Sequence, residues 1–464
     1  MTTTSSKRSR HSIAYSFVII LSVMVTLISC KKNGDYHHNK SSRYSAEVLD
    51  KWMTMQIRLI KNATGIQNQA FSRHFVYAGI AAVEALAPDM AAHSRWSGNW
   101  NGLSGLPTPH PSDEYYYPAN VNAAMAAINK SLFPNASVAD KMAIDSLEVA
   151  LNTAFVAIQT PTIISRSNDF GKSVAAVIFN WAESDGYKNA SSSYTPPVKD
   201  GYWVPTPPAF SAAASPYWGN NRSVVKGSLT NTTPEPPIAY STDPNSAFYQ
   251  MAKNVYDLSQ SLTEDQKAMV MFWRDVPGVS SPGHWLSILQ QVIRKTNARL
   301  DKAALAYAVT GAAINDGLIS VWKTKYKYSL IRPITYIRNV MGHSAWNSYI
   351  GTPGHPEYSS AHSVLSGAAA AVLQEVFGNS GIFTDHTYDY MGFAPRTYAS
   401  FTSIADEAGK SRVYAGIHYQ QSVDAGLIEG RKLAANILNK RYKNDDEDEI
   451  MKAKISSGLA PLGK

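Results

Sequence analysis

Hydrophobic residues recur every three or four positions along most of the chain, as at Val48, Trp52, Met55 and Leu59. A repeat close to 3.6 residues predicts helices that bury one face. Strict alternation of apolar and polar residues over six or more positions, which would indicate strands, is nearly absent. The pattern therefore predicts an all-α protein in which helical bundles are joined by long ordered loops.

Residue composition and helix-end signals locate these helices. Alanine-rich runs favour helix, Ser360 is a good N-cap, and Gly378 closes a strong helix that begins at Ala361. Helices are expected from about residue 45, around residues 75–86, and at 120–132, 138–159, 168–184, 246–274, 285–322, 361–377, 399–416 and 420–441.

Prolines interrupt the helical pattern between residues 191 and 247, where the pairs Pro196-Pro197 and Pro207-Pro208 exclude a continuous helix. The segment also contains Trp203 and Trp218, and it is too aromatic for a flexible linker. We expect an ordered loop that packs over a helical body; a hinge between two domains is the alternative. The chain then divides into an N-terminal helical region (45–190), the loop region (191–247), a second helical region (248–441) and a polar tail (442–464).

The N-terminus is typical of an export signal. Lys7, Arg8 and Arg10 precede an apolar run that ends in Leu27-Ile28-Ser29-Cys30, which resembles a bacterial lipobox. Residues 1–30 are therefore expected to be a lipoprotein signal peptide, with lipid attached to Cys30 and a flexible tether over 31–44. An uncleaved N-terminal membrane anchor is the alternative. Both place the rest of the protein outside the cytoplasm on a membrane, and no further membrane span is expected.

Composition excludes some classes of protein. Hydrophobic residues make up 44% and charged residues 17% of the 464 positions, which suits a folded chain rather than a disordered one. The net charge of +8 is modest, and several of the basic residues lie in the first 32 positions. We find no basic stripe with interleaved aromatic residues, so we expect no nucleic-acid partner.

Three short segments in the second helical region carry candidate chemistry. They are Lys325-x6-Arg332, then Ser359-Ser360-Ala361-His362, then Arg412-x5-His418. Arginine forks match the geometry of tetrahedral oxyanions, and lysine adds a point charge. A helix that starts at Ala361 offers unpaired N–H groups. Together the segments predict a site for an oxyanion, with two histidines available as ligand, nucleophile or proton carrier.

These segments resemble the motifs of the phosphatidic-acid-phosphatase type 2 (PAP2) and vanadium haloperoxidase superfamily. The resemblance implies that fold, and it implies that the second helical region is catalytic. It further implies that His418 ligates the vanadium of vanadate or is phosphorylated, and that His362 exchanges protons. By the same resemblance, the anion is held by Lys325, Arg332, Ser360, the N–H of Ala361, and Arg412.

The sequence departs from the family pattern at three positions. Ser359 stands where the family usually has proline, Ala361 where it has glycine, and Ser422 where it often has an aspartate that orients the third-motif histidine. Alanine still supplies an N–H group at 361. At 422 a weaker partner would harm a phosphoryl nucleophile more than a metal ligand, and a backbone carbonyl is another possible partner for the ring.

Three functions fit this resemblance. The favoured one is a vanadate-dependent haloperoxidase that uses hydrogen peroxide and a halide, with Lys325 and His362 assisting protonation of the peroxide. Trp322 and His355 match positions that line the halide side in such enzymes, and a histidine there resembles the pattern of bromide-oxidising members. The alternatives are an acid phosphatase, which would hold phosphate from a phosphoester in the same site, and a lipoprotein that has lost catalysis and only binds an anion. Asp275 is a possible partner for one of the site arginines.

Overall fold

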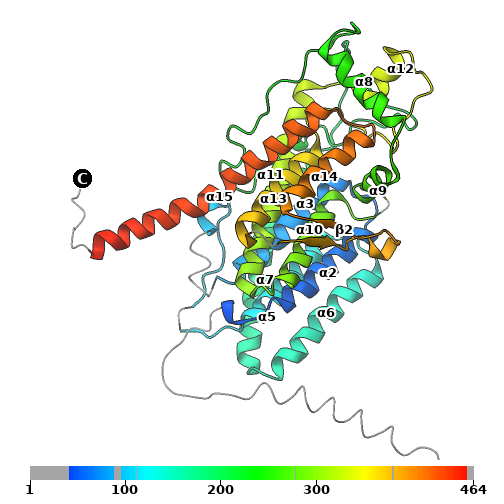
Figure 1. Ribbon diagram of the computed structural model, residues 1–464. Coiled ribbons are helices and arrows are strands. Elements are labelled where there is room, and N and C mark those ends of the chain that lie inside the picture. Colours follow the sequence, from blue (N-terminus) through cyan, green and yellow to red (C-terminus); the bar gives the residue numbers. More distant parts are fainter. Residues whose placement is uncertain (1–40, 88–95, 111, 277, 379–380, 457–464) are drawn as a thin grey trace, which may run out of the picture. The chain divides into compact units, whose positions relative to one another are not determined.

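The computed structural model describes residues 41–87, 96–110, 112–276, 278–378 and 381–456, with backbone only from 441. These residues form thirteen α-helices and one small two-stranded sheet (Figure 1). The expected signal peptide, Cys30 and most of the expected tether lie outside the described residues. The all-α class predicted from the hydrophobic pattern is confirmed.

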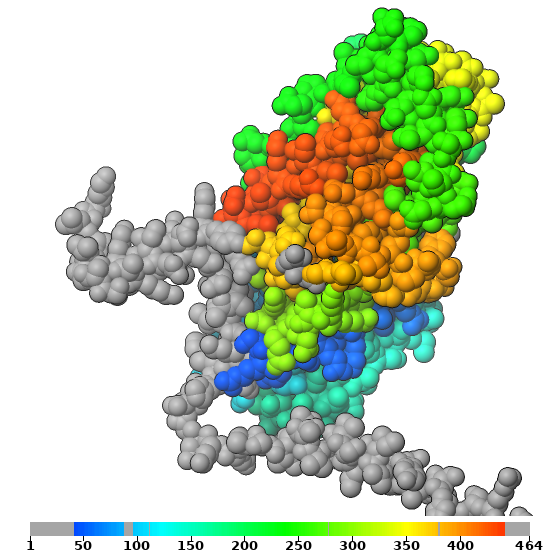
Figure 2. Space-filling view, in the orientation of Figure 1, coloured from blue at the N-terminus to red at the C-terminus, as the bar shows by residue number. Residues whose placement is uncertain are grey.

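The long loop divides the helices into two groups. Before it come α2 (Glu47–Asn62), α3 (Phe71–Glu84), α5 (Tyr117–Leu132), α6 (Val138–Val156) and α7 (Pro161–Ala182). After it come α8 (Ala247–Ser259), α9 (Glu264–Phe272), α10 (Ser281–Lys295), α11 (Leu300–Tyr328), α12 (Pro333–Asn339), α13 (Ala361–Phe377), β1 (Phe383–Asp385), β2 (Arg396–Tyr398), α14 (Phe401–Tyr414) and α15 (Gln420–Ser456). In the face shown in Figure 2, the early helices lie below the later ones.

Helix α11 is the central helix and packs against both groups, with α3 on one side and α13 on another. Helices α3 and α11 approach closely because Gly79 has no side chain. A Cβ at this position would lie 2.8 Å from the carbonyl oxygen of Tyr307. By length and composition alone α11 could span a membrane, but 94% of its most apolar window is buried inside the protein. It therefore has the burial of a core helix.

Helices α13, α14 and α15 complete the side of the body that carries the second and third motifs, and glycine permits the close contact of α13 with α15. A Cβ at Gly430 of α15 would lie 2.1 Å from the carbonyl oxygen of Val364 in α13. The side chain of Ser360 accepts a hydrogen bond from the N–H of Ser363 at 3.4 Å, so the predicted N-cap is present. Helix α13 spans the predicted 361–377 and ends before Gly378.

The segment between Ala182 and Ala247 contains only short 3-10 turns, and it packs on the helices. Trp203 and Trp218 are almost fully buried. The backbone N–H groups of Val224 and Val225 donate to the Asp316 carboxylate of α11 at 2.8 and 3.1 Å. This loop is therefore part of the core, and Ser211 to Ala214 within it reach the candidate active site.

Several expected boundaries differ in the structure. The helix predicted over 246–274 is split, because Thr263 starts a new helix with a capping box. The helix predicted over 285–322 is also split, at a turn where Asn297 adopts φ +47°. The paired strands β1 and β2, which are three residues each, were not predicted because they are too short to show alternation.

The ordered part of the chain extends past two expected boundaries, at 45 and at 441. Helix α15 continues to Ser456, consistent with the absence of glycine and proline from 431 to 457. At the other end, residues 41–44 are ordered rather than flexible. Ser41 is fully buried, and the ring of Tyr44 packs 5.3 Å from that of Tyr116. Arg299 also donates to the carbonyl groups of Ser42 and Arg43.

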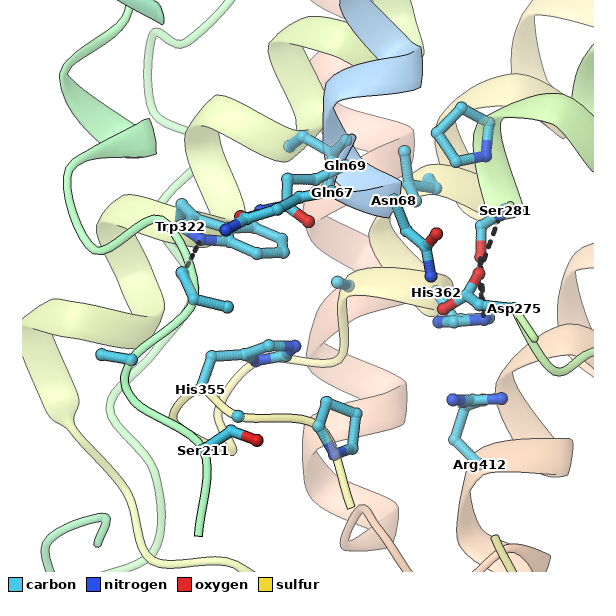
Figure 3. Close-up of a pocket in the computed structure, with 18 of the residues that line it drawn as sticks. Gln67, Asn68, Gln69, Ser211, Asp275, Ser281, Trp322, His355, His362 and Arg412 are labelled. Carbon is cyan, nitrogen blue, oxygen red and sulfur yellow. Dashed lines mark hydrogen bonds and ion pairs between the residues drawn. The ribbon is translucent and has the colours of Figure 1, made fainter. Parts of the chain in front are cut away.

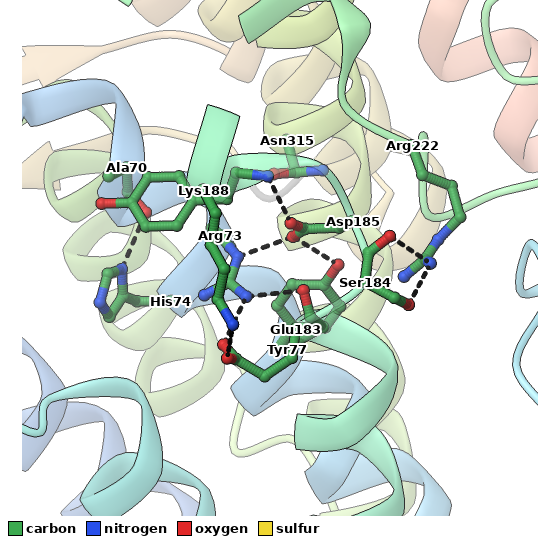
Figure 4. A network of polar contacts seen from close by, with 12 residues as sticks. Ala70, Arg73, His74, Tyr77, Glu183, Ser184, Asp185, Lys188, Arg222 and Asn315 are labelled. Atoms are coloured by element: carbon green, nitrogen blue, oxygen red, sulfur yellow. Dashed lines mark hydrogen bonds and ion pairs between the residues drawn. The ribbon is translucent and has the colours of Figure 1, made fainter. Parts of the chain in front are cut away.

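A buried ion pair joins α3 to the residues that follow α7 (Figure 4). Arg73 donates from Nε to Asp185 at 2.6 Å and from Nη2 to the carbonyl oxygen of Ala182 at 2.7 Å. Asp185 also accepts from the Tyr77 hydroxyl at 2.9 Å. The charge of Arg73 is thus balanced by a carboxylate, as buried charges usually are.

Candidate active site

A cavity of about 540 Å³ opens where three parts of the chain meet (Figure 3). Residues 66–69 form one wall and residues 211–214 another. Helices α10, α11, α13 and α14 and the loop residues Asp275, 353–355 and His418 supply the rest. The predicted site residues that line the cavity are Trp322, His355, Ala361, His362, Arg412 and His418. Lys325, Arg332 and Ser360 are fully buried next to it.

His418 is oriented by a glutamate that the sequence did not reveal. Glu357 accepts from Nδ1 of His418 at 2.8 Å and from the N–H of Tyr419 at 2.9 Å. Ser422, the position where an aspartate was expected, donates to the other oxygen of Glu357 at 2.5 Å. The orienting carboxylate therefore comes from before α13, and the serine holds that carboxylate in place.

This contact fixes the tautomer of His418. Nδ1 carries the proton toward Glu357, and Arg332, which can only donate, lies 3.4 Å from Nε2. Burial and the charges of Arg332, Lys325 and Arg412 lower the pKa of His418 well below its usual value. The ring is therefore neutral, with its lone pair on Nε2, the form in which imidazole ligates a metal.

His362 stands at the start of α13 and contacts α10 and the end of α9. Its Nε2 lies 2.8 Å from the Ser281 hydroxyl and 3.1 Å from the carbonyl oxygen of Trp273. Ser281 donates its own proton to Asp275 at 2.7 Å, so both neighbours accept from Nε2. Nε2 thus carries the proton, and Nδ1 is the basic nitrogen.

The environment keeps His362 neutral. Burial, followed by the charge of Arg412, lowers the pKa of His362 to about 3, although Asp275 opposes the shift. Asp275 lies 3.7 Å from Nε2. Burial raises the pKa of Asp275, but His362, Arg412 and Ser281 outweigh this and lower it overall. The expected partner of Asp275 was an arginine, whereas its contacts are Ser281 and His362.

The two site arginines bind neutral groups. Arg332 donates to the carbonyl oxygens of His355 and Ile417 at 2.9 and 2.7 Å, and to Nδ1 of His355 at 3.0 Å. Arg412 donates to the Trp273 carbonyl oxygen at 3.1 Å, and its buried Nε has no partner among the described residues. Burial lowers the pKa of each arginine to about 10, so both stay charged at neutral pH.

Lys325 is held by backbone. Its Nζ donates to the carbonyl oxygens of Pro356, Glu357 and Ser359 at 3.1, 2.9 and 2.5 Å. These three acceptors use all three N–H groups, so the amine adds charge from behind the cavity wall. Burial and the charge of Arg332 lower the pKa of Lys325 well below its usual value.

The three cations share one property. Within the described residues, no carboxylate oxygen lies within 4.0 Å of a side-chain nitrogen of Lys325, Arg332 or Arg412. Buried charges are normally paired, so a cluster of unpaired cations beside a cavity is built for an anion. The unpartnered Nε of Arg412, the α13 N-terminus and Nε2 of His418 fit a vanadate or phosphate oxyanion with a histidine ligand.

Trp322 and His355 lie together on the opposite side of the cavity from Arg412 (Figure 3). Their ring centroids are 5.1 Å apart. Nδ1 of His355 lies 3.0 Å from Nη2 of Arg332 and 3.2 Å from the carbonyl oxygen of Pro356. Because Arg332 can only donate, Nδ1 accepts from it, and the proton of the neutral ring is on Nε2. Burial and the charges of Lys325 and Arg332 lower the pKa of His355 well below its usual value.

Comparisons with known proteins relate the whole chain to solved structures and its second helical region to a family model. The family model of the VCPO second helical-bundle domain matches residues 305–444. The structure of a bacterial vanadium-dependent iodoperoxidase superposes with a TM-score of 0.76 at 32% identity, covering 88% of this chain and 98% of that one. A bacterial vanadium-dependent chloroperoxidase superposes with a TM-score of 0.61 at 18% identity, covering 81% and 92%, which shows the shared fold.

A curated relative gives a shorter match. The vanadium-dependent bromoperoxidase of Corallina pilulifera is 29% identical over 102 residues, which are 20% of this chain. The matched part spans 17% of the length of that relative.

Proposed function

The chain belongs to the vanadium haloperoxidase superfamily, and from this premise we propose that it oxidises iodide and bromide with hydrogen peroxide at a vanadate held beside His418. The observation that carries the proposal is the set of three buried basic side chains that have no carboxylate within 4.0 Å in the part of the chain that the structure describes. A site for a neutral ligand would not require this unpaired charge.

The residues proposed to bind the oxyanion differ in whether they line the cavity or lie behind its wall. Arg412 and the N–H of Ala361 face the cavity and hold the oxyanion, while Lys325 and Arg332 add charge from behind it. His418 presents the lone pair of Nε2 as the ligand to vanadium, with Glu357 fixing the ring. When bound, vanadate supplies an electrophilic centre that activates hydrogen peroxide toward a halide.

His362 moves the proton. A neutral ring with a basic Nδ1 accepts a proton from hydrogen peroxide and returns it to the leaving oxygen. An anion beside Arg412 cancels part of the charge that lowers the pKa of His362, so the ring becomes a better base once the oxyanion is bound. Ser281 and Asp275 keep Nε2 as the donor throughout.

The halide preference follows from two lines of support. Nε2–H of His355 and the Trp322 ring form a polarisable side to the cavity, which suits bromide as expected from the sequence. The 32% identical relative is an iodoperoxidase, and iodide is the halide that is easiest to oxidise. We therefore propose that iodide reacts fastest, bromide next and chloride not at all.

The test uses the full chain, purified in detergent and freed of bound oxyanions. Oxidation of each halide by hydrogen peroxide is followed with and without orthovanadate, and phosphate release from a phosphomonoester is measured in parallel. Halide oxidation that requires vanadate supports the proposal. Phosphate release that vanadate inhibits, without halide oxidation, would replace it with a phosphatase.

We also propose that the protein is exported and anchored by lipid at Cys30, outside the cytoplasm. The support is the charged start, the apolar run and the lipobox-like Leu27–Cys30. Mass spectrometry of the membrane-purified protein should find a diacylglyceryl-modified Cys30 at the new N-terminus. A retained N-terminus with an unmodified cysteine would contradict the proposal.

A further inference from the structure

A second buried glutamate lies behind the cation cluster, and the proposed mechanism does not use it. Glu429 of α15 is fully buried and accepts from the hydroxyl of Ser359 at 2.7 Å and from that of Ser320 at 2.7 Å. Ser320 belongs to α11, five residues before Lys325. Glu429 therefore ties α15 to α11 and to the loop that carries the second motif.

Its serine partner also holds Lys325. The carbonyl oxygen of Ser359 accepts from Nζ of Lys325 at 2.5 Å, and the Ser359 hydroxyl donates to Glu429. One residue thus connects the buried carboxylate to the buried amine. Position 359 is where the sequence departs from the usual proline of the family, and proline could not make this side-chain contact.

The two glutamates flank the loop in a similar way. Glu357 is held by Ser422 and fixes His418, whereas Glu429 is held by Ser359 and Ser320 and lies near Lys325. Ser422 and Ser359 occupy two of the three departures from the family pattern. Each of these two serines donates to a buried carboxylate, which is the opposite of what decay of the site would leave.

We propose that Glu429 is a positioning residue of the oxyanion site, which fixes through Ser359 the carbonyl groups that hold Lys325 and so sets where the charge of this amine acts. The inference rests on the proposed oxyanion function. Burial raises the pKa of Glu429 to about 7, and above that pH its charge also favours the ammonium form of Lys325, against burial and Arg332. Loss of Glu429 would weaken oxyanion binding by both routes.

The chain offers a matched control elsewhere on α11. Ser228 donates to the buried carboxylate of Asp316 at 2.7 Å, the same bond length as from Ser359 to Glu429, and both serines are fully buried. Ser228 and Asp316 do not line the active-site cavity. Ser359→Ala and Ser228→Ala therefore remove the same kind of bond, one at the site and one away from it.

The experiment measures orthovanadate binding to the oxyanion-free full chain by calorimetry, together with the melting temperature. Ser359→Ala should raise the Kd for vanadate by about tenfold, the effect of losing one hydrogen bond to a charged group. Ser228→Ala should lower the melting temperature about as much as Ser359→Ala does, because each variant loses one buried hydrogen bond. The Kd of Ser228→Ala for vanadate should stay within about twofold of the wild-type value. Glu429→Gln, which preserves shape and removes charge, should raise the Kd at least as much as Ser359→Ala.

Each outcome is decisive. Equal Kd values for Ser359→Ala, Glu429→Gln and Ser228→Ala, with the wild type binding vanadate, would overturn the role of Glu429 and leave the proposed function intact. Should Ser359→Ala fail to fold, Glu429→Gln against the wild type decides alone. A wild-type chain that binds neither vanadate nor phosphate would overturn the proposed function and this inference with it.

Discussion

Two regions of the molecule bury arginine in opposite ways. Arg73 is 5% exposed and meets Asp185 at 2.6 Å, with Glu183 at 3.5 Å. Among the described residues, Arg412 is 2% exposed and donates only to the Trp273 carbonyl oxygen, and its Nε has no partner there. The first arginine has its counter-charge within the fold, whereas the proposed counter-charge of the second is a bound anion. The difference separates a structural ion pair from a binding site without reference to any relative.

The largest expected effect tests the structural side of this comparison. Arg73→Met removes the cation and leaves Asp185 buried without a counter-charge, which should cost about 3–5 kcal/mol of unfolding free energy. Chemical denaturation measures the loss. The double variant Arg73→Met/Asp185→Asn should recover part of it, because no unpaired charge remains. A loss below about 1 kcal/mol for the single variant would contradict the assignment of a structural ion pair.

Arg412→Met should behave in the opposite way. Removing an unpaired buried cation relieves its desolvation cost, so the oxyanion-free protein should be as stable as the wild type or more stable. Vanadate affinity should fall by about 100-fold or more, since a charge-assisted contact at the cavity is lost. Denaturation and calorimetry on the same preparation test both halves. A variant that is destabilised as strongly as Arg73→Met would erase the distinction between the two arginines.

Glu357→Gln should have a smaller effect that is confined to the ligand. A glutamine can present its amide to Nδ1 of His418 and so permit the wrong tautomer, with the proton on Nε2. Loss of such an orienting partner typically costs about 10–100-fold in metal affinity. Vanadate titration measures the change, and ¹⁵N NMR of the imidazole reports the tautomer. An unchanged tautomer with full affinity would show that Arg332 alone orients the ring.

The sequence predicted what depends on local pattern. The limits of α13 followed from Ser360 and Gly378, and the two histidines and three cations were chosen by their spacing. The carboxylates Glu357 and Glu429 were missed because their roles depend on contacts 61 to 109 residues away along the chain.

The walls of the cavity were equally hidden from the sequence. Residues 66–69 and 211–214 reach the site from elements far from the motifs, and neither segment carries a recognisable pattern. Ser281 was also not predicted as a site residue. Only the packing of α10 against α13 brings its hydroxyl to His362.

The last expected effect is a pH dependence that follows from the burial of His362 and from the charge of Arg412 beside it. The pKa of His362 is about 3 in the folded protein and about 6.5 in the unfolded chain. Between these pH values the unfolded state binds more protons than the folded state. The contribution of His362 to the free energy of unfolding is therefore fully present above pH 6.5 and is lost as the pH is lowered toward 3. The slope from this one group is about 1.4 kcal/mol per pH unit.

His362→Gln should therefore flatten the fall in unfolding free energy between pH 6.5 and 5. Saturating vanadate should flatten the wild-type curve in the same direction, since an anion beside Arg412 raises the pKa of His362 toward its unfolded value. Denaturation at a series of pH values provides the curves. Parallel curves for the wild type and His362→Gln would mean that burial and the charge of Arg412 do not lower the pKa of this ring.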